Sequence, residues 1–380
     1  MSSSSVPTVV LVDGLTKVTP KWSPTAPPGE LTGWLGESVS FQVAWLPAVT
    51  DRFAPVHTVT VAVTAGSRPR FHVVDLVPVQ VPCWPEHGEG WLTDSPGLLP
   101  DVLRPVEADG QGRVSLSPTH VGWHSLWVDI RLPADDVHIQ VWDDEELLLD
   151  QVLPVHTVAR ELPPHGSQFT QWFHADSLAT YYDVETWSEE HWRIISAQMH
   201  SAREMGVTML LTPVWTLPVD TAVGAKRRLT QLLDIRRDDG HYSFGTQRLD
   251  RWLETLAEAG IQQVELPHLF TQWGTRFAPR FHVIVDGQAT DLFGWETPAT
   301  DDEYQRFLTA LIPFLKDYFA DRIGLERVVF HISDEPGHQH LASYGQARAS
   351  VGPMLEGCRV LDALSEPEFM NLVEDRKSVV

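Results

Sequence analysis

Two neighbouring carboxylates are the residues of this chain best placed to do chemistry. Residues 328–332 read Val-Val-Phe-His-Ile, a short apolar run that predicts a buried strand, and Asp334 and Glu335 follow it. Carboxylates at the C-terminal end of such a strand are where a barrel enzyme holds its catalytic groups. Two like charges so close resist ionising together, so one can stay protonated near neutral pH and donate a proton. The alternative is structural, because Ser333 or Asp334 could cap a helix that starts near Pro336.

Polar and aromatic side chains also follow the other predicted strands of the C-terminal half. In chain order they are His174, Asp176, Trp215, His268 and His331. In a (β/α)8 barrel the strand ends converge on one mouth, so we expect these residues to meet the two carboxylates and to bind substrate there. Each has a structural alternative, because a lone histidine often serves only a local contact and an aspartate can cap a turn. The basic run at residues 226–228 is expected to be solvated charge.

Tryptophan is unusually frequent, with 15 among 380 residues. Flat indole faces can stack on the C–H faces of sugar rings, whereas an indole N–H in a core needs a hydrogen-bond partner. Trp273 and Trp295 lie in a long insertion over residues 271–298, and together with Trp215 they could form a stacking platform. The alternative is that they pack in the interior, as aromatic residues mostly do.

From residue 169 onward the pattern alternates strand and helix, which predicts a parallel sheet covered by helices. Ser188 is expected to cap one helix, and Thr300 with Glu303 to form a capping box for another. No Gly-x-Gly-x-x-Gly or phosphate-binding loop follows a strand, so a barrel is favoured over a doubly wound nucleotide fold. A (β/α)8 barrel takes about 250 residues, more than follow residue 168. The barrel is therefore expected to be incomplete in this chain.

The N-terminal part has the period of two that is typical of half-buried strands. Val59, Val61 and Val63 alternate with threonines, and Pro- and Gly-rich turns separate such runs, which predicts an antiparallel β-sandwich. Residues 82–118 show little periodicity and are expected to be a long excursion between strands. The sequence therefore predicts a multidomain β plus α/β protein. Its predicted parts are a flexible segment at 1–30, a β-sandwich at 31–160, a linker at 161–168 and an incomplete TIM-type barrel at 169–374. The last residues, 375–380, form a tail that a sequencing adapter could encode.

Composition narrows the class of partner. The formal net charge of −23 argues against nucleic acid or an anionic membrane surface. Cys83 and Cys358 lie far apart, which supports neither a disulfide framework nor a zinc knuckle. No apolar stretch reaches membrane-spanning length, and the serine run at residues 2–5 lacks the pattern of a signal peptide. We therefore expect a cytoplasmic protein without a cofactor, and the sequence leaves its oligomeric state open.

Several longer segments recur, in this order, in one known family. They are Trp-Phe-His-Ala-Asp at 172–176, Ser-Glu-Glu-His-Trp at 188–192, Leu-Thr-Pro at 211–213, Asp-Thr-Ala-Val-Gly at 220–224, His-Leu-Phe-Thr-Gln-Trp-Gly at 268–274, Phe-Gly-Trp-Glu-Thr at 293–297 and Phe-His-Ile-Ser-Asp-Glu-Pro at 330–336. Over residues 168–364 the chain resembles the catalytic domain of glycoside hydrolase family 123, including its DUF4091-type members. The N-terminal half matches less well, mainly through Pro-Asp-Val-Leu at 100–103.

The resemblance implies a glycosidase and gives the two carboxylates separate roles. Characterised members are β-N-acetylgalactosaminidases that act on glycolipid-type glycans and use the 2-acetamido group of the substrate as the nucleophile. Glu335 would then be the general acid/base, and Asp334 would orient the acetamido N–H while an oxazoline intermediate forms. Adjacent carboxylates suit this mechanism independently, because the usual retaining mechanism needs two carboxylates about 5 Å apart on opposite sides of the anomeric carbon. The expected substrate is a glycan with a terminal β-linked N-acetylhexosamine.

Two other functions stay open at this point. A metal-dependent TIM-barrel hydrolase could use His174, His268, His331 and Asp334, although imidazole and carboxylate groups alone do not identify a metal site. A non-catalytic glycan-binding protein could use the tryptophans without turnover. Galacto- or gluco-configuration, the aglycone and the linkage cannot be assigned from these residues.

Overall fold

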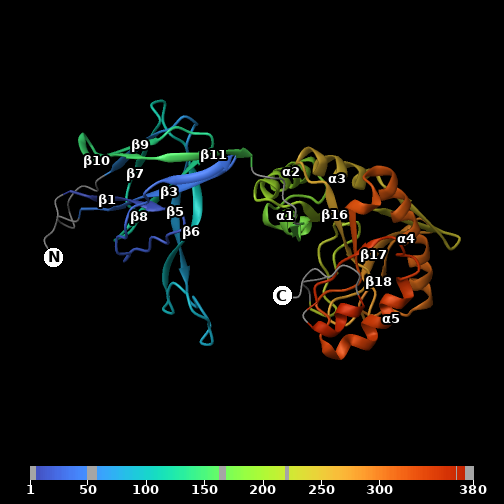
Figure 1. The fold of residues 1–380 in the computed structure, drawn as a ribbon. Coiled ribbons are helices and arrows are strands. Elements are labelled where there is room, and N and C mark those ends of the chain that lie inside the picture. The colour runs from blue at the N-terminus through green and yellow to red at the C-terminus, as the bar shows by residue number, and fades with distance from the viewer. Residues whose placement is uncertain (1–5, 49–57, 162–167, 219–221, 365, 373–380) are drawn as a thin grey trace. The chain divides into compact units, whose positions relative to one another are not determined.

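The computed structural model describes residues 6–48, 58–161, 168–218, 222–364 and 366–372. It divides into two compact units, Met1–Pro164 and His165–Val380 (Figure 1). Within the linker predicted at 161–168, residues 162–167 lie outside the described residues, as do the tail at 375–380 and Asp220.

The first unit consists of two antiparallel sheets that face each other. One has the order β1 (Thr8–Asp13), β3 (Ser38–Leu46), β8 (His124–Arg131), β5 (Arg70–Val79), β6 (Gly97–Val106); the other has the order β10 (Glu146–Leu153), β9 (Val137–Asp143), β4 (Val59–Thr64), β7 (Arg113–Leu116). A short parallel pair joins β2 (Leu31–Leu35) to β11 (Val155–Glu161). Phe41 and Leu126 from the first sheet pack with Val61 and Ile139 from the second in one buried cluster, which is the arrangement of a β-sandwich.

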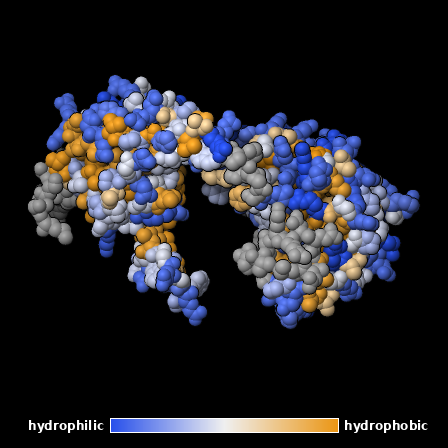
Figure 2. Space-filling model, in the orientation of Figure 1, coloured by the Kyte–Doolittle hydropathy of each residue, from blue (hydrophilic) through white to orange (hydrophobic). Residues whose placement is uncertain are grey.

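Two predictions for this unit are corrected. Residues 8–13, predicted as part of a flexible segment at 1–30, form β1 and pair with β3, because their apolar run supplies buried side chains such as Leu11 and Val12. Residues 82–118, expected to be a long excursion between strands, themselves contain β6 and β7. β6 pairs with β5 in a ribbon that projects from the sheet, and β6 carries exposed Leu98, Val102 and Leu103. Figure 2 shows hydrophobic surface on this ribbon.

A parallel sheet organises the second unit. Its strands are β12 (Thr170–Gln171), β13 (Met209–Leu211), β16 (Gln263–His268), β19 (Val328–His331) and β20 (Arg359–Val360). All four pairings are parallel, and neighbours in the sheet are also neighbours in chain order. This sequential order differs from a doubly wound sheet, where the strand order reverses at a switch point. The described residues show these five strands and not a closed (β/α)8 barrel.

Helices connect the strands and cover the sheet. They are α1 (Ala175–Tyr181), α2 (Glu189–Glu204), α3 (Gln247–Glu258), α4 (Asp302–Arg322) and α5 (Leu341–Val351), with short 3-10 turns η1 (Leu325–Arg327), η2 (His338–His340) and η3 (Pro367–Asn371). The predicted cap of α2 is confirmed, since the Ser188 hydroxyl accepts from the His191 N–H. The capping box predicted at Thr300 is wrong by one residue. Asp301 caps α4 by accepting from the N–H groups of Glu303 and Tyr304.

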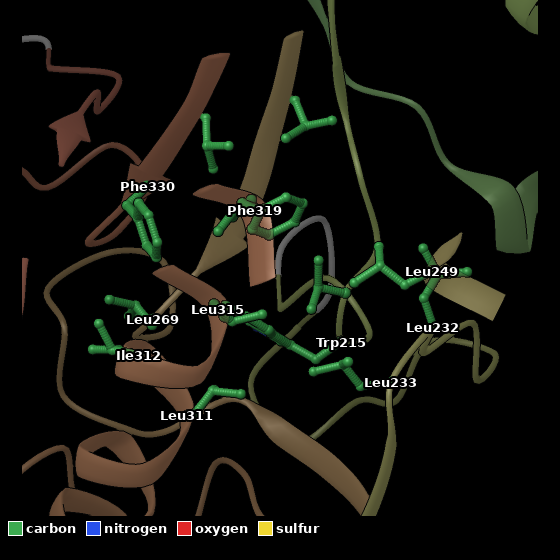
Figure 3. Packing of buried hydrophobic residues seen from close by; sticks show 14 of the residues in the cluster. Trp215, Leu232, Leu233, Leu249, Leu269, Leu311, Ile312, Leu315, Phe319 and Phe330 are labelled. Carbon is green, nitrogen blue, oxygen red and sulfur yellow. The ribbon is translucent and has the colours of Figure 1, made fainter. Parts of the chain in front are cut away.

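A second, smaller sheet is built from segments inserted after β13 and β16. Its order is β15 (His241–Gly245), β14 (Asp234–Asp238), β17 (Arg280–Val285), β18 (Gln288–Phe293). The hairpin β17–β18 falls within residues 271–298, which were predicted to be a long insertion. Phe281 packs 4.7 Å from Phe307 of α4, ring centre to ring centre. Figure 3 shows the apolar interior, to which α4 contributes Leu315 and Phe319 and β19 contributes Phe330. Among the described residues, no helix is both long enough and apolar enough to cross a membrane.

Candidate active site

The two predicted catalytic carboxylates follow β19 and have different surroundings. Asp334 is buried, with 6% of its surface exposed, whereas Glu335 is exposed. Glu335 has a φ of +41°, a left-handed conformation that is strained for a residue with a side chain and that occurs preferentially at functional sites. The N-cap of η2 is Gly337, so helix capping by Ser333 or Asp334 does not explain this pair. One carboxylate is held inside the protein and its neighbour faces solvent.

The loop after β16 holds the segment that carries these carboxylates. The backbone N–H of Trp273 donates to the carbonyl oxygen of Asp334 at 3.0 Å. The Ser333 hydroxyl donates to the carbonyl oxygen of Thr271 at 2.9 Å. Trp273 also has a positive φ, +57°, and half of its surface is exposed. An exposed indole therefore lies in the loop that is bonded directly to the carboxylate segment.

Next to these carboxylates in the chain, a histidine is enclosed by two buried acidic side chains. His331 Nε2 lies 2.7 Å from Glu265 Oε1, and His331 Nδ1 lies 3.1 Å from Asp362 Oδ1. All three side chains are at most 4% exposed. His331 Nε2 forms an ion pair with Glu265, but its N–H does not point at the carboxylate oxygen, so this contact is not a hydrogen bond. His331 Nδ1–H does donate a hydrogen bond to Asp362. Glu265 also accepts from the Trp172 indole at 3.0 Å and from the Thr170 hydroxyl.

These acidic neighbours decide the protonation of His331. Burial by itself lowers the pKa of an imidazole, but the charge of Glu265 and the hydrogen bond to Asp362 outweigh it and raise the pKa of His331 to about 10. Burial tends to raise the pKa of Glu265, but the positive charge of His331 outweighs burial, so the pKa of Glu265 lies below its usual value. At neutral pH the structure therefore holds an imidazolium between carboxylates at the end of the central strands.

His268, the neighbour of His331, has the opposite character. Its ring lies 4.6 Å from that of His331 and 5.5 Å from that of Trp172, and the side chain has no exposed surface. Neither ring nitrogen has a hydrogen-bond partner among the described residues. Burial, followed by the positive charge of His331, holds the pKa of His268 well below its usual value. His268 is therefore neutral, and neither histidine is placed to touch a substrate, contrary to the prediction.

His174 and Asp176 meet an arginine that the sequence did not single out. The Arg227 guanidinium donates to Asp176 through Nε at 2.8 Å and through Nη2 at 2.9 Å. The same Nη2 lies 2.8 Å from His174 Nδ1. Both charged side chains are close to nine-tenths buried, so the prediction that residues 226–228 are solvated is wrong for Arg227. The Asp176 carboxylate binds Arg227, where a sugar hydroxyl had been expected.

The three candidate tryptophans have different environments. Trp215 has no exposed surface, donates its indole N–H to the carbonyl oxygen of His268 at 3.2 Å, and packs against Phe281. It cannot offer a ring face to a sugar, so the predicted stacking role is wrong for this residue. Trp273 is half exposed and Trp295 is partly exposed. These two remain the candidates for a sugar platform.

A cavity of about 250 Å³ lies beside this region. It is formed by the loops after β13 and β16 and by the end of β18. Trp295 supplies its aromatic wall, and its charged lining comprises Lys226, Arg227, Arg280, Asp291 and Glu296. Thr271 also lines it and accepts the hydrogen bond from Ser333, so the cavity adjoins the loop bonded to the carboxylate segment. An aromatic wall with a few polar groups is typical of small-ligand sites.

Sequence reasoning missed Glu265, Asp362 and Arg227, although two of them left a signal. Glu265 interrupts the apolar strand Val264–Leu266 and has no exposed surface. A charged residue in a buried strand must be paired, which marks a site. Asp362 follows β20 by two residues, as the other candidates follow their strands. Arg227 gave no such signal, because it lies in a basic run within a loop.

The ligand set of the metal-dependent alternative is not assembled in the described part of the chain. No three His, Cys, Asp or Glu side chains there are arranged to hold a metal ion. His174 contacts Arg227, and both ring nitrogens of His331 face carboxylates, Glu265 and Asp362.

A comparison with models of known protein families identifies one family. Residues 172–379, more than half of the chain, match the model of the glycoside hydrolase 123 catalytic domain. A solved family 123 glycoside hydrolase from Clostridium perfringens, from a study of glycolipid glycan hydrolysis, is similar with a TM-score of 0.62 and 14% identity. The similarity covers 90% of this chain and 61% of that chain, so this chain spans less than two thirds of that enzyme. At this identity the likeness shows the fold alone.

Other solved structures are less similar. A GH5 xyloglucanase from Bacteroides ovatus gives a TM-score of 0.26 at 7% identity, over 93% of this chain and 68% of that chain. A family 39 glycoside hydrolase from Bacteroides cellulosilyticus gives 0.27 at 11% identity, over 88% of this chain and 50% of that chain. TM-scores this low do not establish a shared fold. No curated protein sequence matches the chain significantly.

Proposed function

Because this chain belongs to glycoside hydrolase family 123, we propose that it removes a terminal β-linked N-acetylhexosamine, with N-acetylgalactosamine as the preferred sugar, by a retaining mechanism. The observation that carries the proposal is the pair that follows β19, with Asp334 buried and Glu335 exposed. Consecutive residues cannot flank the anomeric carbon from opposite faces, as an enzyme nucleophile and an acid must in the usual retaining mechanism. The nucleophile is then supplied by the substrate.

In the proposed first step, Glu335 donates its proton to the glycosidic oxygen and the bond from that oxygen to C1 breaks. The acetamido oxygen of the substrate forms a new bond to C1 and closes an oxazolinium ring that keeps its N–H, and Asp334 accepts the hydrogen bond from this N–H. In the second step Glu335, now a carboxylate, removes a proton from water. That water attacks C1, opens the ring and restores the acetamido group. General acid catalysis of this kind contributes about 10²- to 10⁴-fold in rate.

The environments of the two carboxylates support these roles. A buried aspartate whose backbone is bonded to Trp273 is fixed in position, which suits a group that must orient the acetamido N–H. An exposed glutamate at a strained backbone position can reach both the leaving group and water. Trp273 and Trp295 are proposed to hold the sugar ring, and the cavity beside Trp295 to receive part of the glycan.

The experiment that tests the function is a hydrolysis screen with aryl glycosides. The full-length protein is given the β-N-acetylgalactosaminide, the β-N-acetylglucosaminide and the corresponding sugars that lack the acetamido group. We expect turnover of the first, weaker turnover of the second and none of the others. Equal activity on sugars without the acetamido group would exclude substrate assistance.

A variant of the general acid separates catalysis from binding. The substitution Glu335→Gln should abolish cleavage and leave binding of the N-acetylhexosamine in place. If the wild-type protein binds the sugar and never cleaves it, the chain is a glycan-binding protein. If turnover requires stoichiometric zinc, the metal-dependent alternative is correct.

A further inference from the structure

We propose that Asp362 is a positioning residue for the carboxylate pair, and that the His331–Glu265 ion pair holds Asp362 in place. The proposal rests on the proposed glycosidase function and extends it to a residue that has no contact with substrate in that mechanism. Asp362 has only 3% of its surface exposed. It must therefore act through the groups that it binds.

The Asp362 carboxylate binds the backbone that leads into Asp334. Its Oδ1 accepts from the N–H of Ile332 at 2.9 Å and faces the N–H of Ser333 at 3.4 Å. The same oxygen accepts from His331 Nδ1, while the other oxygen accepts from the Tyr344 hydroxyl. One carboxylate thus fixes the peptide groups immediately before the carboxylate pair. A catalytic group displaced by about 1 Å can lose about 10²-fold in rate.

The charged cluster connects four of the five central strands. Glu265 lies in β16 and binds Thr170 of β12, His331 ends β19, and Asp362 follows β20. With two carboxylates and one imidazolium, the three charged side chains sum to −1. Each carboxylate depends on the same cation, because a buried charge without a partner is strongly unfavourable. Movement at the end of one strand is therefore opposed by contacts to its neighbours.

The second unit contains a matched pair for comparison. Asp250 accepts from the Tyr318 hydroxyl at 2.8 Å, as Asp362 accepts from that of Tyr344. Asp250 lies on α3 and Tyr318 on α4, outside the segment that follows β19. The two Asp–Tyr pairs have the same chemistry, and only one of them is bonded to the segment that carries Asp334.

The experiment compares Asp362→Asn, Tyr344→Phe and Tyr318→Phe in the full-length protein on the aryl β-N-acetylgalactosaminide. We expect Asp362→Asn to lower kcat about 10²-fold with KM changed less than about threefold, because the acid is misplaced and the sugar contacts remain. Tyr344→Phe should lower kcat about fivefold, the equivalent of one hydrogen bond, and Tyr318→Phe should leave it unchanged. Equal kcat in the two tyrosine variants, or a wild-type kcat in Asp362→Asn, would overturn the proposal.

Hydrogen exchange separates this inference from the function on which it rests. In Asp362→Asn the amides of Ile332 and Ser333 should exchange faster than in the wild type, whereas the Asp250–Tyr318 region should not change. If the wild-type protein cleaves none of the glycosides, the proposed function fails and the exchange rates alone decide on positioning. Unchanged exchange at Ile332 and Ser333 would refute the role of Asp362 even in an active enzyme.

Discussion

Two buried histidines, His124 in the first unit and His331 in the second, have opposite charge states. In the β-sandwich, His124 is 7% exposed and stacks on Trp45 and His120. Burial, followed by the proximity of His120, lowers the pKa of His124 to about 4. In the second unit His331 is 3% exposed, and its pKa is about 10. Burial is similar at the two positions, so the carboxylates around His331 make the difference.

The contrast distinguishes a unit with an apolar interior from one that keeps charges inside. The cluster at the centre of the sandwich consists of apolar side chains, and His124 satisfies its nitrogens with nearby backbone groups. The second unit holds Glu265, His331 and Asp362 at the ends of its parallel strands, next to the proposed catalytic pair. Buried ion pairs add little net stability for their cost, so their presence at the ends of these strands favours a role in the site over a role in stability.

The largest effect expected from this contrast is on activity. Glu335→Gln should lower kcat on the aryl β-N-acetylgalactosaminide by about 10²- to 10⁴-fold, because the amide cannot donate a proton to the leaving group. His124→Gln in the sandwich should leave kcat unchanged. Steady-state kinetics of the two variants measures the difference. A comparable loss in both variants would mean that activity is not confined to the second unit.

The next effect concerns stability. His331→Gln removes the cation from between two buried carboxylates and should cost about 3–5 kcal/mol in the free energy of unfolding of the second unit. His124→Gln removes a neutral group and should cost about 1–3 kcal/mol in the sandwich. Urea unfolding, followed separately for each unit, tests the ranking. The double variant His331→Gln with Glu265→Gln keeps the net charge of the cluster and should recover part of the loss.

The two histidines also predict opposite dependences of stability on pH. The folded pKa of His331 is raised, so its contribution is complete below about pH 6.5 and is lost as the pH rises toward about 10. The folded pKa of His124 is lowered, so the sandwich loses stability as the pH falls from about 6.5 to about 4. Thermal unfolding across this range, with His331→Gln and His124→Gln as controls, should remove each dependence in turn. A parallel response of both units would contradict the assignment.

The smallest expected effect is on KM, and two exposed tryptophans, one in each unit, are compared to measure it. Trp273→Ala should raise KM about fivefold, since loss of one aromatic face is worth about 1 kcal/mol. Trp84 in the first unit is 77% exposed, and Trp84→Ala should leave KM unchanged. Initial rates at varied substrate concentration measure both. An effect of Trp84 with none of Trp273 would move the sugar platform to the sandwich unit.

The sequence predicted the strand ends better than the side-chain roles. The parallel order and the positions of His174, His268, Asp334 and Glu335 follow from apolar runs that end in polar residues, a local signal. Whether a residue at a strand end faces the site or the interior depends on packing between distant elements. Trp215 and His268 were therefore misassigned, because the inserted strand β17 brings Phe281 against Trp215 and the neighbouring strand β19 brings His331 against His268. Pairing across long separations, as between Asp176 and Arg227, leaves no pattern in a single sequence.

The most direct test of the central claim is a series of aryl 2-acylamido-β-galactosides in which the acetyl group carries none, one, two or three fluorine atoms. Fluorine withdraws electrons from the acyl oxygen and weakens it as a nucleophile, while the leaving group stays the same. If the pair at 334 and 335 acts with the help of the substrate, kcat/KM falls steeply with each added fluorine. A rate that is independent of fluorination would show that the acyl group takes no part in the reaction and would contradict the proposed mechanism.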